Sequence, residues 1–297
     1  MSGGLGLVVV IHDSAPELER LLDSVSDRLT TAPQVVVVDT GSRDGGAELA
    51  RRRGAELVSL PGNPGFGAAN NAGLARVREP LAALVNPDVE LLDDGLMRLA
   101  VRAQGAERLF VPGLINPDGG RQRSAHPLPG TLGAFIPAVL PPAALPRAVR
   151  ERVEPWRARA PRTVGWAIAA CVVARTRLLR RLGPFDPDIF LFHEDLDLCL
   201  RARAAGVATE LHPEIVLRHA GGHSTRAAYP DEPHLEVARR RREVVARELG
   251  RRALALDDAA QATTFAARIL ARGLLPRDSA RERAQLRALL TARRAPV

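Results

Sequence analysis

Lysine is missing from this chain, and aromatic residues are scarce. All 42 basic residues are arginine, which excludes a phosphate-binding loop built around a lysine. Only 3% of the residues are aromatic, which leaves few side chains for stacking nucleic-acid bases. The net charge of +8 points to an anionic partner, but an all-arginine excess beside abundant Ala, Gly and Pro indicates a GC-rich coding bias. We therefore expect no nucleic-acid binding.

Cysteines and long apolar runs are also few. Cys171 and Cys199 form no Cys-x-x-Cys pair, which excludes a common zinc or redox motif and predicts two buried thiols in a reducing compartment. The apolar start of the chain is too short for a signal peptide. The run at 164–174 is too short to span a bilayer, and prolines interrupt the run at 132–146. We expect a soluble, cytoplasmic protein that at most lies on the inner face of the cell membrane.

Short apolar runs and amphipathic stretches alternate through the first hundred residues. Strands are expected at 5–13, 34–40, 55–60 and 81–89, with helices between them at 15–29, 45–54 and 70–79. This order predicts an α/β fold with a mixed, mostly parallel, Rossmann-like sheet and helices on both faces.

The remainder of the chain is less regular. We expect further strands at 108–115, 163–175 and 208–224, a helix at 176–183, and a long loop with one short helix at 125–162. Arginine-rich amphipathic helices are expected from about residue 234 onward. These patterns predict a main domain over 1–230, divided near residue 100, and a helical extension over 231–297.

Polar motifs follow the expected strands of the first half. Because the carboxyl ends of parallel strands meet at one edge, these motifs should face one crevice. Glycine-rich turns before helices expose backbone N–H groups to phosphate, and a carboxylate such as Asp88 suits Mg²⁺ or Mn²⁺. Each motif alone is a turn or a helix cap, but together they predict a nucleotide-diphosphate site with a metal. Its expected nucleotide contacts are Asp39, Gly41, Asn63, Gly65 and Asn71.

The segment FDPDIFLFHEDLDLCLRARAAG (185–206) places carboxylates inside an apolar frame. Glu194 and Asp195 fall at the start of a predicted helix, where negative charge is stabilised. The preceding IFLF run should deliver this pair into a half-buried place, where one carboxylate could serve as a general base. Asp197 is interpreted as a helix-surface partner of Arg201, four residues later.

These motifs together resemble the family 2 glycosyltransferases of GT-A fold, and in particular bacterial rhamnosyltransferases that use dTDP-rhamnose. The resemblance covers about residues 5–226 and rests on four segments besides FDPDIFLFHEDLDLCLRARAAG: DTGSRDGG, NPGFGAANNAG, NPD and HAGGHS. It implies a nucleotide-binding half at about 1–100 and an acceptor half at about 101–230. It also implies metal-dependent, inverting transfer of a sugar to a hydroxyl of a cell-envelope glycan or a polyprenyl-diphosphate-linked acceptor.

The resemblance also implies roles for single residues. Asp39 contacts the nucleoside, and Asp13 borders the nucleobase in a segment, Ile11-His12-Asp13, that departs from the usual Thr-Tyr-Asn. Asp88 is the last acid of a DxD-type metal site, and His219 approaches the metal or the diphosphate. Asp195, beside Glu194, deprotonates the acceptor hydroxyl. Trp166 is a candidate platform for a sugar ring.

Three alternatives are kept at this stage. A nucleotidyltransferase shares the general fold, but a Gly-rich basic loop is missing after the first strand. A nucleic-acid-binding protein fits only the charge, and an inactive relative would explain the altered first strand. The arginine-rich C-terminal helices resemble tails that dock on membranes. The sequence does not predict an oligomeric state.

Overall fold

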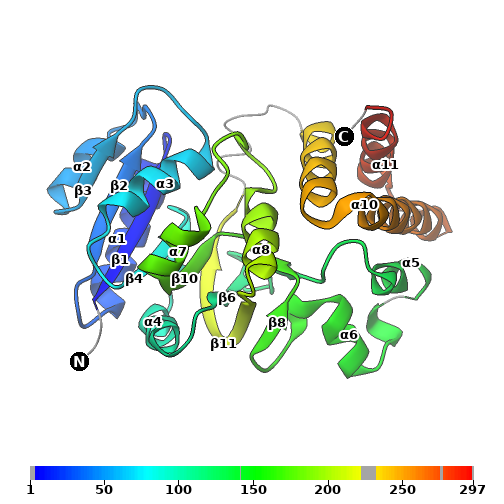
Figure 1. Cartoon of the computed structure of the whole chain (residues 1–297), viewed down its shortest axis with the longest axis horizontal. Helices are drawn as coiled ribbons and strands as arrows, with labels where there is room; N and C mark the ends of the chain where they lie inside the picture. The colour runs from blue at the N-terminus through cyan, green and yellow to red at the C-terminus, as the bar shows by residue number, and fades with distance from the viewer. Residues whose placement is uncertain (1–3, 141, 222–231, 275–276, 296–297) are drawn as a thin grey trace.

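The computed structural model describes residues 4–140, 142–221, 232–274 and 277–295 (Figure 1). Within these ranges, nine strands form one central sheet with the order β3-β2-β1-β4-β10-β6-β11-β5, and β8 pairs with β11. The strands of this sheet are β1 Leu5–Ile11, β2 Gln34–Asp39, β3 Glu56–Ser59, β4 Leu81–Val85, β5 Val89–Leu91, β6 Leu109–Ile115, β8 Arg162–Val164, β10 Cys171–Arg175 and β11 Thr209–His219.

The first half of the sheet confirms the expected parallel arrangement. β1 pairs in parallel with β2 and with β4, and β2 with β3. Val36, Val37 and Val38 of β2 are fully buried because helices cover both faces of the sheet. One face of the sheet packs on α1 (Ala15–Arg28), α2 (Gly46–Arg52) and α4 (Gly95–Gly105). The other face packs on α3 (Phe66–Arg76) and α7 (Thr176–Leu182).

The second half mixes directions. β10 runs antiparallel between β4 and β6, whereas β11 is parallel to β6. A single strand at 163–175 was expected, and this expectation is wrong. The chain leaves the sheet at Gly165, where a Cβ atom would lie 2.1 Å from the Leu128 backbone nitrogen. It pairs as β9 (Trp166–Ala167) with β7 (Ala125–His126) before β10 begins.

The segment expected to be a long loop holds more structure than predicted. Besides β7, it forms the short helices η1 Leu132–Phe135, α5 Ile136–Val139, η2 Pro142–Ala144, α6 Arg147–Val153 and η3 Pro155–Arg157. Its prolines allow only short elements because they lack a donor and restrict the preceding residue.

The C-terminal helices pack back onto the sheet domain rather than extending away from it. α10 (His234–Leu274) bends at Gly250, whose φ is 84°, and α11 spans Ala280–Ala292. The first part of α10 buries Val244 and Val245 in a cluster with Leu196 and Leu200 of α8 (Glu194–Ala204). The proposed domain boundary at residue 230 lies outside the described residues. Within them, no helix is long and apolar enough to cross a membrane.

Asp197 corrects an expectation about the surface of α8. It does pair with Arg201 at 2.7 Å, but its side chain is fully buried rather than on the helix surface. A second arginine, Arg247 of α10, bonds the other carboxylate oxygen at 2.6 Å and reaches Asp186 at 2.9 Å. A buried carboxylate needs such partners, so Asp197 ties α10 to α8.

Candidate active site

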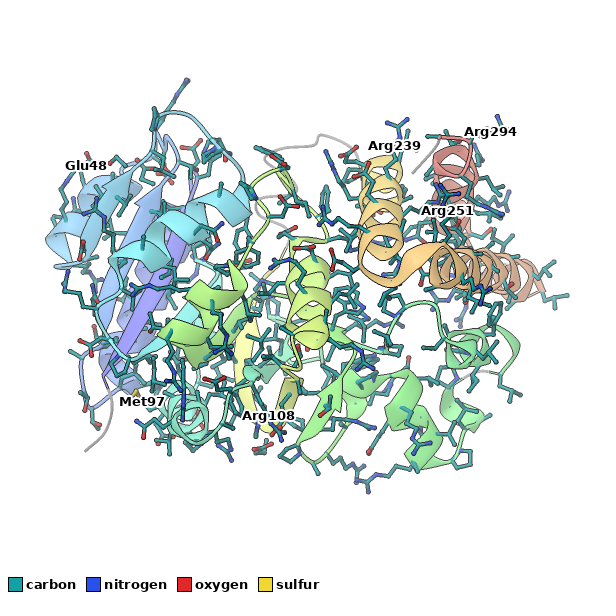
Figure 2. The ribbon with its side chains drawn as sticks, viewed as in Figure 1. Glu48, Met97, Arg108, Arg239, Arg251 and Arg294 are labelled. Carbon is teal, nitrogen blue, oxygen red and sulfur yellow. The ribbon has the colours of Figure 1, made fainter. Side chains whose placement is uncertain are left out.

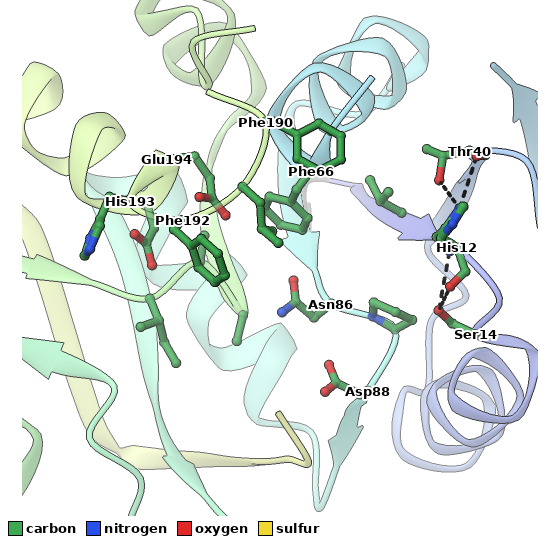
Figure 3. Close-up of a pocket in the computed structure, with 18 of the residues that line it drawn as sticks. His12, Ser14, Thr40, Phe66, Asn86, Asp88, Phe190, Phe192, His193 and Glu194 are labelled. Atoms are coloured by element: carbon green, nitrogen blue, oxygen red, sulfur yellow. Dashed lines mark hydrogen bonds between the residues drawn. The ribbon is translucent and has the colours of Figure 1, made fainter. Parts of the chain in front are cut away.

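A pocket of about 630 Å³ opens at the carboxyl edge of the parallel strands (Figure 3). The turns after β1, β2 and β4 form one wall, and the segment before α8 forms the opposite wall. The loop before α3, β9 with the turn after it, the end of β11 and the start of α10 complete the lining. The polar side chains that line the pocket are His12, Ser14, Thr40, Asn63, Asn86, Asp88, Trp166, His193, Glu194, Asp195 and His219.

Asp88, in the turn after β4, and His219, the last residue of β11, meet in this pocket. His219 Nε2 lies 3.3 Å from Asp88 Oδ1, and both side chains are more than nine-tenths buried. Nδ1 of His219 lies 2.8 Å from Gln122 Oε1, which can only accept, so Nδ1 carries the proton. Burial raises the pKa of Asp88, but the hydrogen bond and charge of His219 outweigh this effect and lower the pKa overall.

This arrangement fits a divalent cation. The hydrogen bond and charge that lower the pKa of Asp88 belong to a doubly protonated His219. When the ring carries its single proton on Nδ1, it instead turns the lone pair of Nε2 toward the carboxylate, and two acceptors repel unless a proton or cation lies between them. Asn86 Oδ1 is buried beside them without a hydrogen-bond partner among the described residues, and Asn86 Nδ2 is 3.4 Å from His219 Nε2. Hard oxygen ligands with one imidazole suit Mg²⁺ or Mn²⁺. Among the described residues, no third His, Cys, Asp or Glu side chain joins Asp88 and His219 to form a larger metal-binding group.

Glu194 and Asp195 begin α8 on the opposite wall. Burial raises the pKa of both carboxyls, and the charge of Asp195 raises that of Glu194 further. The two residues before them, Phe192 and His193, have φ values of 71° and 64°. Non-glycine residues rarely adopt this conformation, and such strain collects at functional sites. The strained turn aims the start of α8 into the pocket.

The glycine-rich loop before α3 approaches this strained turn closely. Gly65 has a φ of 93°, and a Cβ atom there would lie 2.5 Å from the Phe190 carbonyl oxygen. Asn63 Oδ1 accepts the Gly65 N–H at 3.0 Å, and the Phe66 N–H donates to the Phe190 carbonyl at 3.2 Å. The loop therefore fixes one edge of the pocket against the 190–192 segment.

The structure brings seven of the predicted site residues together and leaves four outside. Those that line the pocket are Asn63, Gly65, Asp88, Trp166, Glu194, Asp195 and His219. Asp39 lies just behind the lining, where its Oδ1 accepts the Ser42 N–H at 2.9 Å. Asp13 accepts the Arg43 N–H at 2.6 Å and shapes the same turn with Gly41, whose φ is 93°. His223, the second histidine of the HAGGHS segment, lies outside the described residues.

Asn71 is placed differently from the expectation. Helix α3 begins at Phe66 rather than at residue 70, so the prediction that Asn71 stands at a helix start is wrong. Its amide donates to the Phe185 carbonyl at 2.7 Å and accepts the Phe185 N–H at 3.2 Å. Because both ends of this amide are used, we propose that Asn71 anchors the 185–195 segment.

Trp166 lines the pocket but offers little open ring surface. Its side chain is 7% exposed, and the His126 ring stacks on it at 4.2 Å with an angle of 17°. The His193 ring meets it edge-on at 6.1 Å. A sugar could therefore touch an edge of Trp166, whereas one full face is covered.

Several residues that line the pocket were not predicted from the sequence as site residues. His12 Nδ1 lies 3.2 Å from both the Thr40 hydroxyl and the Thr40 carbonyl oxygen, and Ser14 donates to the His12 carbonyl (Figure 3). Their position just after β1 and β2 is the signal that could have identified them. His193 stands directly before Glu194 in the 185–206 segment, and that position is the signal that could have identified it. No local pattern indicated Val237, because α10 reaches the pocket only through tertiary packing.

Comparisons with known proteins agree with this geometry. The family model "Glycosyl transferase family 2" matches residues 7–149. The N-acetylglucosaminyl-diphospho-decaprenol L-rhamnosyltransferase of Mycobacterium tuberculosis is 32% identical over 247 residues, which is 76% of this chain and 78% of that protein. A hexosyltransferase of low-salt glycan biosynthesis from Haloferax volcanii is 22% identical over 70% of this chain and 64% of that protein.

Solved structures share the architecture. A mannosyltransferase from Pyrobaculum calidifontis, solved with GDP-Man and Mn²⁺, has a TM-score of 0.61 at 17% identity, over 98% of this chain and 86% of that one. Glucosyl-3-phosphoglycerate synthase from M. tuberculosis, solved with Mn²⁺ and UDP, has a TM-score of 0.53 at 16% identity, over 83% and 80%. The mixed sheet thus has a GT-A-type fold.

The identity and coverage of the rhamnosyltransferase, together with the family match, settle the assignment. The chain belongs to glycosyl transferase family 2, and it is a glycosyltransferase.

Proposed function

We propose that this enzyme transfers a sugar with inversion, rhamnose from dTDP-rhamnose, to a polyprenyl-diphosphate-linked glycan acceptor. The observation that carries the proposal is the meeting of two chemistries in one pocket. Asp88 and His219 lie 3.3 Å apart in this pocket, in the turn after β4 and at the end of β11, and a buried carboxylate, Asp195, lines the same pocket from the start of α8. The rhamnosyltransferase relative supports the choice of sugar and acceptor through its name.

The chain's own residues would divide the work as follows. Asp88 and His219 would hold Mg²⁺ or Mn²⁺, which supplies charge neutralisation for the departing diphosphate. Asp195 would take the proton of the acceptor hydroxyl as the hydroxyl oxygen attacks the anomeric carbon from the face opposite the nucleotide. The apolar segment before α8 would exclude water, so that transfer outruns hydrolysis. Asp39, Asp13, Gly41, Asn63 and Gly65 would surround the nucleotide as backbone-shaping or contacting residues.

The donor is tested by thermal unfolding with nucleotide sugars in the presence of Mg²⁺ or Mn²⁺. A ligand that binds only the folded protein stabilises it by about 2.7 kcal/mol at one hundred times its Kd. We expect the largest rise in Tm with dTDP-rhamnose and metal, a smaller rise with dTDP, and little with GDP-mannose or UDP-glucose. If a uridine or guanosine sugar gives the largest rise, the proposed donor is wrong.

The acceptor is tested by transfer to a short-chain N-acetylglucosaminyl-diphospho-lipid, with the product followed by NMR of the new anomeric proton. We expect one inverted linkage and no nucleotide transfer to a sugar phosphate. Release of pyrophosphate from dTTP with a sugar phosphate would instead support the nucleotidyltransferase alternative.

A lipid-linked acceptor implies contact with the inner face of a membrane, and we propose where this contact lies. Some arginines of the C-terminal helices are engaged in ion pairs, for example Arg240 with Glu236 and Arg241 with Asp257. Others, such as Arg239 and Arg251, are exposed on α10 (Figure 2). Large apolar side chains are also exposed in the last turns of α10 and in or next to η1 and α5, two elements that α10 contacts. They are Leu132, Leu140, Leu270 and Leu274, between 49% and 85% exposed.

This contact is tested by flotation with vesicles that contain phosphatidylglycerol. We expect the double variant Leu270→Glu/Leu274→Glu to float at least fivefold less than the wild type, because buried apolar area and attraction to anionic lipid both decrease. Val101→Glu is the matched control, since Val101 is 59% exposed on α4, away from this surface. Equal flotation of the double variant and the wild type would contradict the proposal.

A further inference from the structure

Glu194 has a carboxyl group that its surroundings do not accommodate as an anion. Its side chain is 8% exposed, and Oε2 is buried without a hydrogen-bond partner among the described residues. No ion pair of Glu194 occurs in the described part of the chain. Figure 3 shows that this carboxyl points into the pocket, in the neighbourhood of the aromatic side chains that line it. A bare carboxylate in such a place is strongly disfavoured.

Asp195, the next residue, has partners that Glu194 lacks. Asp195 Oδ1 accepts the Leu196 N–H at 2.7 Å, and the Ala169 N–H also donates to its carboxylate. Arg241 of α10 adds an attractive charge, although that guanidinium is already held by Asp257 through two bonds of 2.8 Å. These contacts favour the charged form of Asp195 over that of Glu194.

The other titratable groups near the pair do not change this difference. Burial lowers the pKa of His193 to about 3 and that of His126 to about 4, so both rings are neutral and offer Glu194 no positive charge. Asp197, one turn along α8, is neutralised by Arg201 and Arg247. Two neighbouring acids in unequal surroundings take up the proton unequally, which assigns one as acid and the other as base.

We propose that Glu194 works as a neutral carboxylic acid, whose Oε2–H donates a hydrogen bond to a hydroxyl oxygen of the sugar bound in the pocket, and that Asp195 is the only carboxylate base on this wall. The proposal rests on the proposed sugar transfer. The hydroxyl belongs to the donor sugar or to the acceptor sugar, which share this chemistry. A buried donor of this kind rejects a sugar that lacks the hydroxyl, because the acid would then remain without a partner.

The first test uses two variants of different hydrogen-bonding capacity. Glu194→Gln retains an N–H donor, whereas Glu194→Leu has a similar size and no donor. We expect kcat/KM to fall less than tenfold in Glu194→Gln and about tenfold further in Glu194→Leu. Of the KM values for the donor and for the acceptor, the one that rises more identifies the sugar whose hydroxyl contacts Glu194. Equal losses in Gln and Leu would contradict the donor role. Circular dichroism and thermal unfolding establish that both variants are folded.

The second test measures how kcat/KM depends on pH, which a merely structural role of Glu194 would not change. If Glu194 is neutral, Glu194→Gln leaves the charge beside Asp195 unchanged, and the acid limb of kcat/KM stays in place. If Glu194 is a carboxylate, the same change removes a neighbouring negative charge and moves the acid limb to lower pH by about one unit or more. The matched control is Asp188→Asn, an exposed acid of the same segment that does not line the pocket.

Infrared spectroscopy tests the protonation state without any activity. The wild-type protein at neutral pH should show the carbonyl stretch of a protonated carboxylic acid, which disappears in Glu194→Gln and persists in Asp188→Asn. Absence of this band in the wild type would overturn the inference even if sugar transfer is demonstrated. Conversely, if the band is present but the protein transfers no sugar, the protonation of Glu194 stands and the proposed function fails.

Discussion

Asp195→Asn is expected to bind the nucleotide sugar with wild-type affinity and to lower kcat for transfer by about a thousandfold or more. The asparagine side chain can still accept the Leu196 N–H that holds Asp195, so the local structure is retained. It cannot take a proton from the acceptor hydroxyl, and general base catalysis alone is worth about 10²–10⁴-fold. Donor affinity is expected to stay unchanged because Asp88 and His219, the residues proposed to hold the metal, are not altered.

The measurement combines calorimetric titration of the donor with single-turnover transfer kinetics. The pH dependence gives a second check on the wild type. Burial raises the pKa of Asp195 above the ordinary value of 3.8, so the base loses its proton only at a higher pH than a free aspartate does. We therefore expect kcat/KM to fall as the pH drops through this raised pKa, well above pH 3.8. Near wild-type turnover of Asp195→Asn would remove this residue as the base.

Much of the fold follows from local patterns in the sequence. The strands β1, β2 and β4 were predictable because buried parallel strands read as continuous apolar runs, as in QVVVVD. The pocket edge followed in turn, since the carboxyl ends of such strands share one side of the sheet. The start of α8 at Glu194 was predictable from acids that precede a helical apolar spacing.

The remaining features depend on contacts between distant segments. Nothing near Gly165 shows that the Leu128 backbone will approach it and redirect the strand. The burial of Asp197 depends on Arg247, fifty residues later, which arrives only when α10 folds back. The same return of α10 brings Val237 to the pocket. Hydrophobic periodicity describes one helix or strand at a time, so it could not predict these contacts between distant segments.

Asp88→Ala is expected to abolish the metal-dependent part of nucleotide binding. In the wild type, Mn²⁺ should tighten dTDP binding, since the cation would link the Asp88 carboxylate and His219 to the diphosphate. Asp88→Ala removes the carboxylate ligand and leaves only the imidazole of this pair. We therefore expect dTDP affinity in Mn²⁺ to fall about 10–100-fold, toward the affinity measured in EDTA. Isothermal titration of dTDP, with and without Mn²⁺, measures both values.

Two further variants separate loss of the ligand from loss of structure. Asp88 Oδ2 also accepts the Gly221 N–H at 2.7 Å, so Asp88→Ala removes a loop contact along with the charge. Asp88→Asn retains an acceptor for this N–H but lacks the negative charge, and it should lose metal-dependent binding almost as fully. Glu90→Gln is the matched control, because Glu90 lies two residues along the chain and pairs only with Arg218 at the partly exposed edge of β11. Unchanged dTDP titrations of Asp88→Ala in Mn²⁺ would refute the metal role of Asp88.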